Sequence, residues 1–159
     1  YSLDHHRGSE EQQPGEVYFD AELYDEVSGR VDTFRNFRTT LELTGLSNTV
    51  IPIVAPSMLT VRHWTTPLAL VFIDGGHSYT AAFSDYTAWM PHVIPGGYLL
   101  VHDIFLDINE GGQAPRFIYN RALDSGLFEA LPMTKTLGVL RRRPLGYVPE
   151  EIANIRDWG

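Results

Sequence analysis

Four side chains that can bind a metal ion or accept a proton stand just after two apolar runs, at residues 68–73 and 98–101. They are Asp74, His77, His102 and Asp103. Two carboxylates and one imidazole are suitable ligands for magnesium, manganese or zinc, and an oxygen-rich set favours magnesium. A second imidazole can accept the proton of a hydroxyl group whose pKa a metal ion has lowered. These residue types are therefore consistent with metal-assisted chemistry on a hydroxyl group.

The same residues also have structural roles open to them. A carboxylate after a strand often caps the next helix, which is an equal alternative for Asp74. His102 can serve as a structural hydrogen-bond donor, and His77 can bond a backbone carbonyl in its turn. His5 and His6 are expected to line a loop and not to bind a metal ion. The residues alone leave both interpretations open.

The elements that must position these side chains form a strand–helix–strand unit. Residues 68–73 contain no polar residue, which predicts a strand buried on both faces. Ser78 is a suitable N-cap for a helix over 79–90, and Pro95-Gly96-Gly97 marks a break before the strand at 98–101. A unit of this length predicts two parallel strands with a right-handed crossover. The polar residues that follow both strands are therefore expected to share one small cleft.

The remaining segments continue the alternation of strands and helices. Asp32 is expected to cap a helix that Gly45 ends, with Phe34, Phe37, Leu41 and Leu43 on its buried side. Loops are predicted at 8–16 and 103–113. The other predicted elements are a strand ending at residue 3, helices over 33–44, 57–64 and 115–124, a strand over 49–54, and an antiparallel pair over 128–134 and 137–142. This order predicts an α/β, doubly wound and mostly parallel sheet in one domain over 1–143, followed by a tail at 144–159.

Composition limits the classes of protein that fit. A chain of 159 residues with 43% hydrophobic residues suits one packed domain. The net charge of −8 argues against a nucleic-acid surface, and Arg141-Arg142-Arg143 is expected to be an exposed strand end. A sequence without cysteine has no disulfide, thiolate zinc site or cysteine nucleophile. The sequence shows no membrane-spanning run or signal peptide, so we expect a cytoplasmic protein without a membrane partner.

Residues 71–103, VFIDGGHSYTAAFSDYTAWMPHVIPGGYLLVHD, carry a resemblance to a known family. Asp-Gly-x-His-x-Tyr, an Asp and a Trp on the following helix, Pro-Gly-Gly and His-Asp together resemble the later half of a class I S-adenosylmethionine-dependent methyltransferase. The most similar members are small-molecule O-methyltransferases of the catechol and macrocin type. The resemblance runs from Asp4 to about Arg142 and implies a Rossmann-like sheet with a terminal antiparallel strand pair. It also implies S-adenosylmethionine as cofactor and a small-molecule hydroxyl as acceptor.

The resemblance assigns roles to individual residues. Asp4 matches the acidic residue that binds the ribose hydroxyls of the cofactor, and Ser57 matches the position that meets the adenine edge. Asp74 matches a carboxylate close to both cofactor and metal. With His102-Asp103 it would hold a divalent cation, such as magnesium, in metal-dependent members. His77 matches the position of a basic residue and is the candidate catalytic base.

The family pattern also contains a glycine-rich cofactor loop that should precede Asp4. We therefore expect this chain to be the carboxyl-terminal part of a longer protein, without the first strand and helix of the fold. Because that strand lies between the second and fourth strands, its absence would split the sheet and leave two unpaired edges. A second chain, or a second copy of this one, could complete the sheet.

Two other functions remain as alternatives. A methyltransferase-like remnant could act as a non-catalytic interaction module. Asp4-His5-His6 and Gly75-Gly76-His77 also resemble parts of the Asp-His-His phosphoesterases, which are manganese hydrolases. That family requires further aspartate motifs upstream and a longer spacing between these two elements, so it is the weaker alternative.

Overall fold

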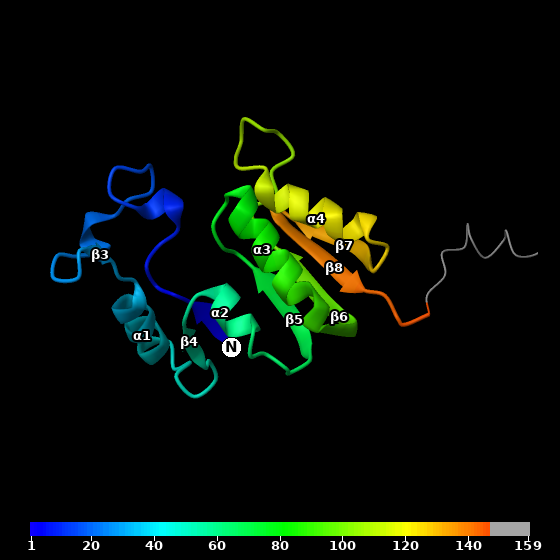
Figure 1. Cartoon of the computed structure of the whole chain (residues 1–159), viewed down its shortest axis with the longest axis horizontal. Helices are drawn as coiled ribbons and strands as arrows, with labels where there is room; N and C mark the ends of the chain where they lie inside the picture. Colours follow the sequence, from blue (N-terminus) through cyan, green and yellow to red (C-terminus); the bar gives the residue numbers. More distant parts are fainter. Residues whose placement is uncertain (147–159) are drawn as a thin grey trace, which may run out of the picture. The chain divides into compact units, whose positions relative to one another are not determined.

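The computed structural model describes residues 1–146, so most of the predicted tail at 144–159 lies outside the described residues (Figure 1). The chain divides into two compact units. The first unit contains residues 1–65 and 75–88, and the second contains 66–74 and the residues from 89 onward. The single domain over 1–143 stays a prediction. The chain is a mixed α/β protein, as the alternation of elements indicated.

The second unit is built on a four-stranded sheet. Its strands are β5 (Leu68–Ile73), β6 (Val93–Val101), β7 (Phe128–Thr134) and β8 (Leu137–Arg142), in the order β5-β6-β8-β7. β5 and β6 are parallel, while β8 is antiparallel to both β6 and β7. The predicted parallel pair and the predicted terminal antiparallel pair are both confirmed.

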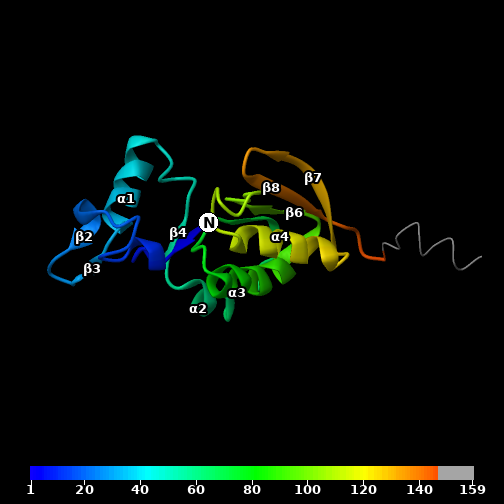
Figure 2. The same cartoon turned by 90° about the horizontal axis from the view of Figure 1, so that it is seen from above.

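Helix α4 (Ala114–Asp124) covers one face of this sheet (Figures 1 and 2). Pro115 lies in its first turn, as predicted, where its missing amide hydrogen costs no helical bond. Leu99 and Leu140 are cross-strand partners and, like Ile118 of α4, are 0% exposed. Burial of these apolar side chains is the main contribution to the stability of this unit.

The opposite face of β5 differs from the prediction. Val71 and Ile73 are buried, whereas Leu70 and Phe72 are each 50% exposed. The run has the composition of a strand covered on both sides, but α4 covers only one side of the sheet. The expected burial on both faces is therefore wrong for the described residues, because an apolar run cannot show whether a second layer is present.

Strand β6 is longer than predicted and runs through Pro95-Gly96-Gly97, which is not a break. Leu68 pairs with Val93 and Leu70 with Tyr98, so β6 bulges between these two pairs. A Cβ atom on Gly97 would lie 2.8 Å from the carbonyl oxygen of Ala69, so only glycine permits this approach of the two strands. The break expected from proline and glycine is in fact a bulge.

The first unit contains a parallel pair of strands, β1 (Ser2–Asp4) and β4 (Pro52–Val54). β4 is shorter than the predicted strand over 49–54 because its pairing starts at Ser2. Among the described residues β4 pairs only with β1, which agrees with the edge position that Pro52 favours. The other elements are β2 (Tyr24–Asp25), β3 (Arg30–Val31), α1 (Phe34–Leu43), α2 (Ser57–Val61) and α3 (Tyr79–Trp89), with short 3-10 turns at Glu10–Gln12, Ala21–Leu23 and, in the second unit, Met90–His92.

Helix α1 follows the predicted signals at both ends. The Asp32 carboxylate accepts a hydrogen bond from the amide of Phe34 at 2.9 Å, and Gly45 leaves the helix with a φ of 70°. Leu41 is buried, but Leu43 is 83% exposed and does not belong to the buried side. Two residues on, Leu43 is rotated far around the helix axis from Leu41 and cannot share its face.

Gly138 of β8 lies against Ile104 and against Tyr119 of α4. A Cβ atom at this position would overlap Cδ1 of Ile104 and would lie 2.7 Å from Cδ2 of Tyr119. Gly138→Ala is therefore expected to lower the free energy of unfolding by about 1–3 kcal/mol through overpacking. Urea unfolding followed by circular dichroism measures this change. Adding Ile104→Val removes Cδ1, so the double variant should lose less than the sum of the single losses; simple additivity would contradict the packing.

Candidate active site

Asp74, His102 and Asp103 come together in the second unit. Nδ1 of His102 lies 3.2 Å from Oδ1 of Asp74 and 3.0 Å from Oδ1 of Asp103. One potential ligand atom from each residue lies within 4.8 Å of the others. The three side chains are partly accessible, with exposed fractions of 47%, 40% and 25% in that order. The convergence expected from the sequence is therefore present.

Strand register explains this cluster. Ile73 pairs with Val101 in the parallel β5–β6 ladder, so the residues that follow them, Asp74 and His102, leave neighbouring strand ends. The amide of His102 donates to the carbonyl of Ile73 at 3.1 Å, which extends the ladder by one bond. Asp103 then adopts a φ of 56°, a left-handed conformation that aspartate tolerates better than most residues. This conformation turns the chain so that the Asp103 carboxylate lies against His102.

The donor set of this cluster fits a divalent cation. Two carboxylates held this close repel each other unless a positive charge lies between them. Either an imidazolium or a metal ion can supply that charge, and two oxygens with one imidazole nitrogen suit manganese as well as magnesium. The ring of Phe72 stands edge-on to His102, with centroids 6.1 Å apart, and forms an apolar side to the cluster.

The N-terminus of α3 is the place where Asp74 would act if it were a helix cap and not a site residue. Oγ of Ser78 accepts a hydrogen bond from the amide of Ala81 at 3.2 Å, so Ser78 acts as the predicted N-cap. The carboxylate of Asp74 is directed to His102 at the strand end.

The two residues expected to bind the cofactor both follow the parallel strands of the first unit. Asp4 ends β1, and Ser57 begins α2 just after β4. The Asp4 carboxylate is 53% exposed, and its Oδ1 accepts a hydrogen bond from the amide of His6 at 2.7 Å. The carbonyl of Asp4 accepts from the amide of Ala55, which joins the two strand ends. Asp4 and the start of α2 therefore both lie at the carboxyl end of the parallel β1–β4 pair.

His5 and His6 behave as loop residues, as expected. His6 is 5% exposed, and its Nδ1 lies 2.8 Å from Oγ1 of Thr33. The rings of Phe34 and Phe37 each stand 5.1 Å from its ring. A histidine enclosed in this way ties the end of β1 to α1 and is poorly placed to bind a metal ion, which argues against the phosphoesterase alternative.

His77 lies in the first unit and pairs with a residue that the sequence did not suggest. Its Nδ1 is 3.2 Å from Oε2 of Glu11, in the 3-10 turn of the loop after β1. The polar residues 8–16 indicate only a surface loop. No local pattern links Glu11 to His77, because the contact forms only after the chain has folded.

Two comparisons with known proteins show which family and which fold this chain resembles. Residues 1–104 match the model of a family described as a methyltransferase domain. The chain belongs to this family. A solved structure described as an O-methyltransferase family protein from Burkholderia thailandensis is 17% identical to the chain, with a TM-score of 0.52. That match covers 72% of this chain and 42% of the other, so the chain spans less than half the length of that structure.

The likeness to the O-methyltransferase structure shows a shared fold.

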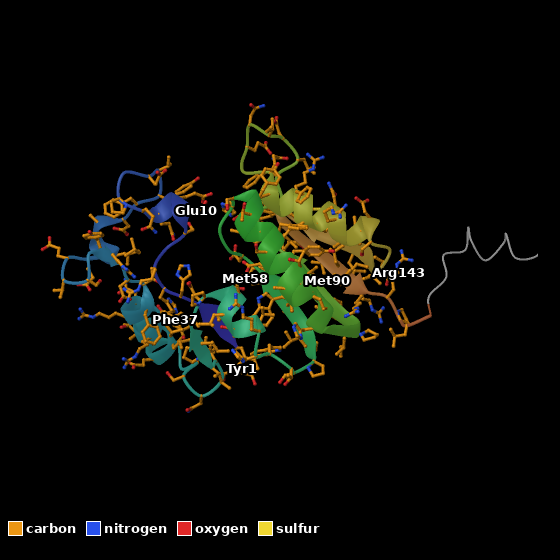
Figure 3. The ribbon with its side chains drawn as sticks, viewed as in Figure 1. Tyr1, Glu10, Phe37, Met58, Met90 and Arg143 are labelled. Atoms are coloured by element: carbon orange, nitrogen blue, oxygen red, sulfur yellow. The ribbon has the colours of Figure 1, made fainter. Side chains whose placement is uncertain are left out.

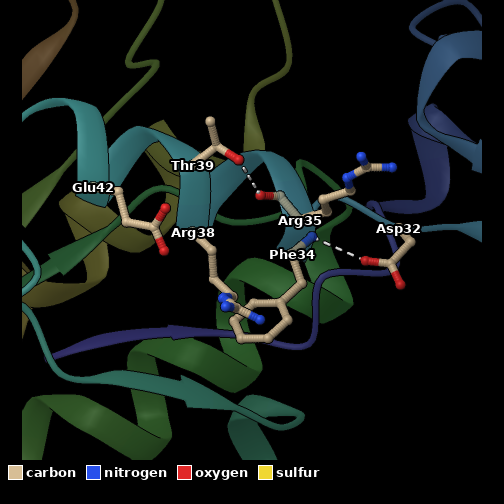
Figure 4. A pocket seen from close by; sticks show the side chains of 6 residues that line it. All are labelled: Asp32, Phe34, Arg35, Arg38, Thr39 and Glu42. Atoms are coloured by element: carbon tan, nitrogen blue, oxygen red, sulfur yellow. Dashed lines mark hydrogen bonds between the residues drawn. The ribbon is translucent and has the colours of Figure 1, made fainter.

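Within residues 1–146, no helix combines the length and the apolar character needed to cross a membrane. Figure 4 shows a hollow along α1, and none of the residues that line it is a predicted site residue. It is lined by Asp32, Phe34, Arg35, Arg38, Thr39 and Glu42.

Asp85 of α3 is a further candidate in the methyltransferase domain. Burial raises the pKa of its carboxyl, while a hydrogen bond with Ser57 and the charge of His5 act in the opposite direction. A Cβ atom on Gly75 would lie 3.0 Å from Oδ2 of Asp85, so the turn after β5 leaves room for this carboxylate. The family pattern contains an aspartate on this helix, but the sequence indicates no role for it. Asp85 links α3 to the predicted adenine-binding residue.

The raised pKa of Asp85 predicts a pH dependence of stability. In the folded state this pKa lies above its ordinary value of 3.8, so its contribution to stability is fully present at low pH and is lost as the pH rises through the folded value. Asparagine cannot ionise. The stability of Asp85→Asn relative to wild type should therefore increase between about pH 4 and pH 7.5.

Thermal unfolding of both proteins across this pH range measures the difference. Asp25→Asn is the matched control, because a hydrogen bond from Ser28 lowers the pKa of Asp25. Asp25 titrates at or below its ordinary value of 3.8 in both the folded and the unfolded state, so the relative stability of Asp25→Asn should stay nearly constant across this range. A difference for Asp85→Asn that stays constant with pH would contradict the prediction.

Proposed function

We propose that this chain is part of an S-adenosylmethionine-dependent methyltransferase that methylates a hydroxyl group of a small molecule. The observation that carries the proposal is the convergence of Asp74, His102 and Asp103 in a chain of the methyltransferase domain family. Carboxylates and imidazole at neighbouring strand ends are groups that can bind and activate a hydroxyl acceptor. The likeness to an O-methyltransferase fold supports the same class of protein.

The reaction sets clear requirements for the protein. The acceptor oxygen forms a bond to the methyl carbon while the carbon–sulfur bond of the donor breaks, and the hydroxyl proton must be removed. His77 is the residue proposed to accept that proton. It follows Asp74 by three positions, so the covalent chain alone limits the separation of their Cα atoms to about 11 Å.

The proposed cofactor-binding residues are Asp4, Ser57 and Asp74. A carboxylate can accept two hydrogen bonds from the cis-diol of a ribose, and the exposed Asp4 side chain leaves oxygen surface for this contact. Ser57 would meet the adenine edge, and its bond with Asp85 supports the orientation of its hydroxyl.

Asp74, His102 and Asp103 are proposed to hold a divalent cation. When bound, the cation would lower the pKa of the acceptor hydroxyl. Phe72 would limit access of water on one side of the ligands. The chain's own residues would bind and orient the acceptor oxygen, and His77 would receive its proton.

The open strand edges support a proposal about assembly. Among the described residues β1 pairs only with β4, and β5 pairs only with β6. A strand from outside residues 1–146, in the longer protein or in a second chain, would pair with these edges and complete the doubly wound sheet.

Loss of the Asp4 carboxylate tests the cofactor site. Asp4→Ala in the full-length protein should weaken binding of S-adenosylmethionine by about 1.5–3 kcal/mol, because a charge-assisted pair of hydrogen bonds is lost. Isothermal titration calorimetry measures the affinity. Glu26→Ala, an exposed carboxylate of the same unit, is the control and should bind as wild type. Equal affinity of Asp4→Ala and wild type would remove Asp4 from the site, and a full-length wild type that binds no cofactor would favour the non-catalytic module.

Loss of Asp103 tests the metal site. Asp103→Ala should weaken manganese binding to the full-length protein by at least about tenfold, because one of three ligands is removed. Paramagnetic resonance of free manganese measures binding without an acceptor. Glu110→Ala, exposed in the loop after β6, is the matched control. Methyl transfer that continues unchanged in excess EDTA would exclude the cation from the mechanism.

A further inference from the structure

The loop after β1 is braced by its own side chains. Oε1 of Gln12 accepts the amide of Ser9 at 2.9 Å. Nε2 of Gln13 donates to the carbonyl oxygens of Arg7, Gly8 and Ser9 at 3.0, 3.3 and 2.9 Å. These bonds hold the 3-10 turn at Glu10–Gln12 in one conformation. Glu11 therefore lies in a turn whose backbone is held in place by side-chain hydrogen bonds.

The braced loop packs against the turn that carries His77. A Cβ atom on Gly76 would lie 3.6 Å from Cβ of Ser9, which is ordinary van der Waals contact. Beside this contact, Oε2 of Glu11 lies 3.2 Å from Nδ1 of His77. The side chains are 36% and 30% exposed, so both remain accessible from solvent. Two segments far apart in the sequence thus bring one carboxylate to one ring nitrogen.

We propose that Glu11 is a positioning residue for His77, and this proposal rests on the proposed function. A carboxylate at Nδ1 accepts the Nδ1–H bond and fixes the neutral ring in the tautomer whose lone pair is on Nε2. Nε2 then takes the proton of the acceptor hydroxyl as the oxygen–methyl bond forms and the carbon–sulfur bond breaks. The carboxylate stabilises the imidazolium that results.

The exposure of the pair separates this role from a structural one. An ion pair between partly exposed side chains adds little to folding stability. Removal of Glu11 is therefore expected to change the ring's tautomer and the reaction rate while the fold is kept. A carboxylate bonded to Nδ1 sets the ring proton in either case, but a merely structural contact would leave kcat unchanged when it is removed.

The first measurement is the tautomer of His77 in full-length protein labelled with ¹⁵N-histidine. The His77→Gln spectrum assigns the ring signals. Wild type should show the Nδ1–H form, and Glu11→Ala should shift toward the Nε2–H form. Glu11→Gln, whose amide oxygen can still accept the Nδ1–H bond, should keep the wild-type tautomer. Glu10→Ala, the neighbouring carboxylate in the same turn, is the matched control and should have no effect (Figure 3).

The second measurement is methyl transfer from S-adenosylmethionine to catechol as a probe acceptor. Glu11→Ala should lower kcat by about tenfold without changing the KM for the cofactor, and His77→Ala should lower it by about a hundredfold or more. Glu10→Ala should match wild type.

The outcomes separate the two proposals. An unchanged tautomer in Glu11→Ala, or a changed tautomer with wild-type kcat, overturns the role of Glu11 while the methyltransferase assignment stands. A failure of the proposed function appears instead as wild-type protein that transfers no methyl group, or as a fully active His77→Ala variant. The tautomer measurement needs no acceptor and still decides whether Glu11 sets the ring.

Discussion

The parallel pairing of β5 with β6 is the constraint on which the candidate metal site depends. The pair Ile73–Val101 fixes which residues leave the two strand ends together. The same register puts Val71 and Leu99 on the face covered by α4. A shift of one residue would turn these apolar side chains to solvent and would separate the polar residues beyond them. Core packing and the site are therefore specified by one set of hydrogen bonds.

Carboxylate–imidazole pairs recur at the candidate site residues. His102 lies between two carboxylates, His77 faces Glu11, and Asp4 has Nδ1 of His5 at 3.8 Å. In a chain with a net charge of −8, each such imidazole can supply local positive charge or exchange a proton. Under the proposed function, these pairs would supply the groups for metal binding and proton transfer without any cysteine.

Contacts between segments that are far apart in the sequence orient side chains whose approximate positions are set by the strands. Asp85 reaches Ser57 from a different element, and Glu11 reaches His77 from the loop after β1. Both supporting carboxylates lie in the first unit, as do the residues that they contact. The supporting role proposed for them agrees with the general rule that groups around a site orient the residues that act in it.

The sequence by itself determined the features that depend on local pattern. The strands at 68–73, 128–134 and 137–142, the helix beginning near Pro115, and the convergence of Asp74 with His102-Asp103 follow from apolar runs, turn residues and the rule for strand ends. Only the tertiary structure decided the bulge at Gly97, the exposed face of β5, and the partners of Ser57 and His77. Those features depend on which distant segments pack together, and a one-dimensional pattern carries no information on such packing.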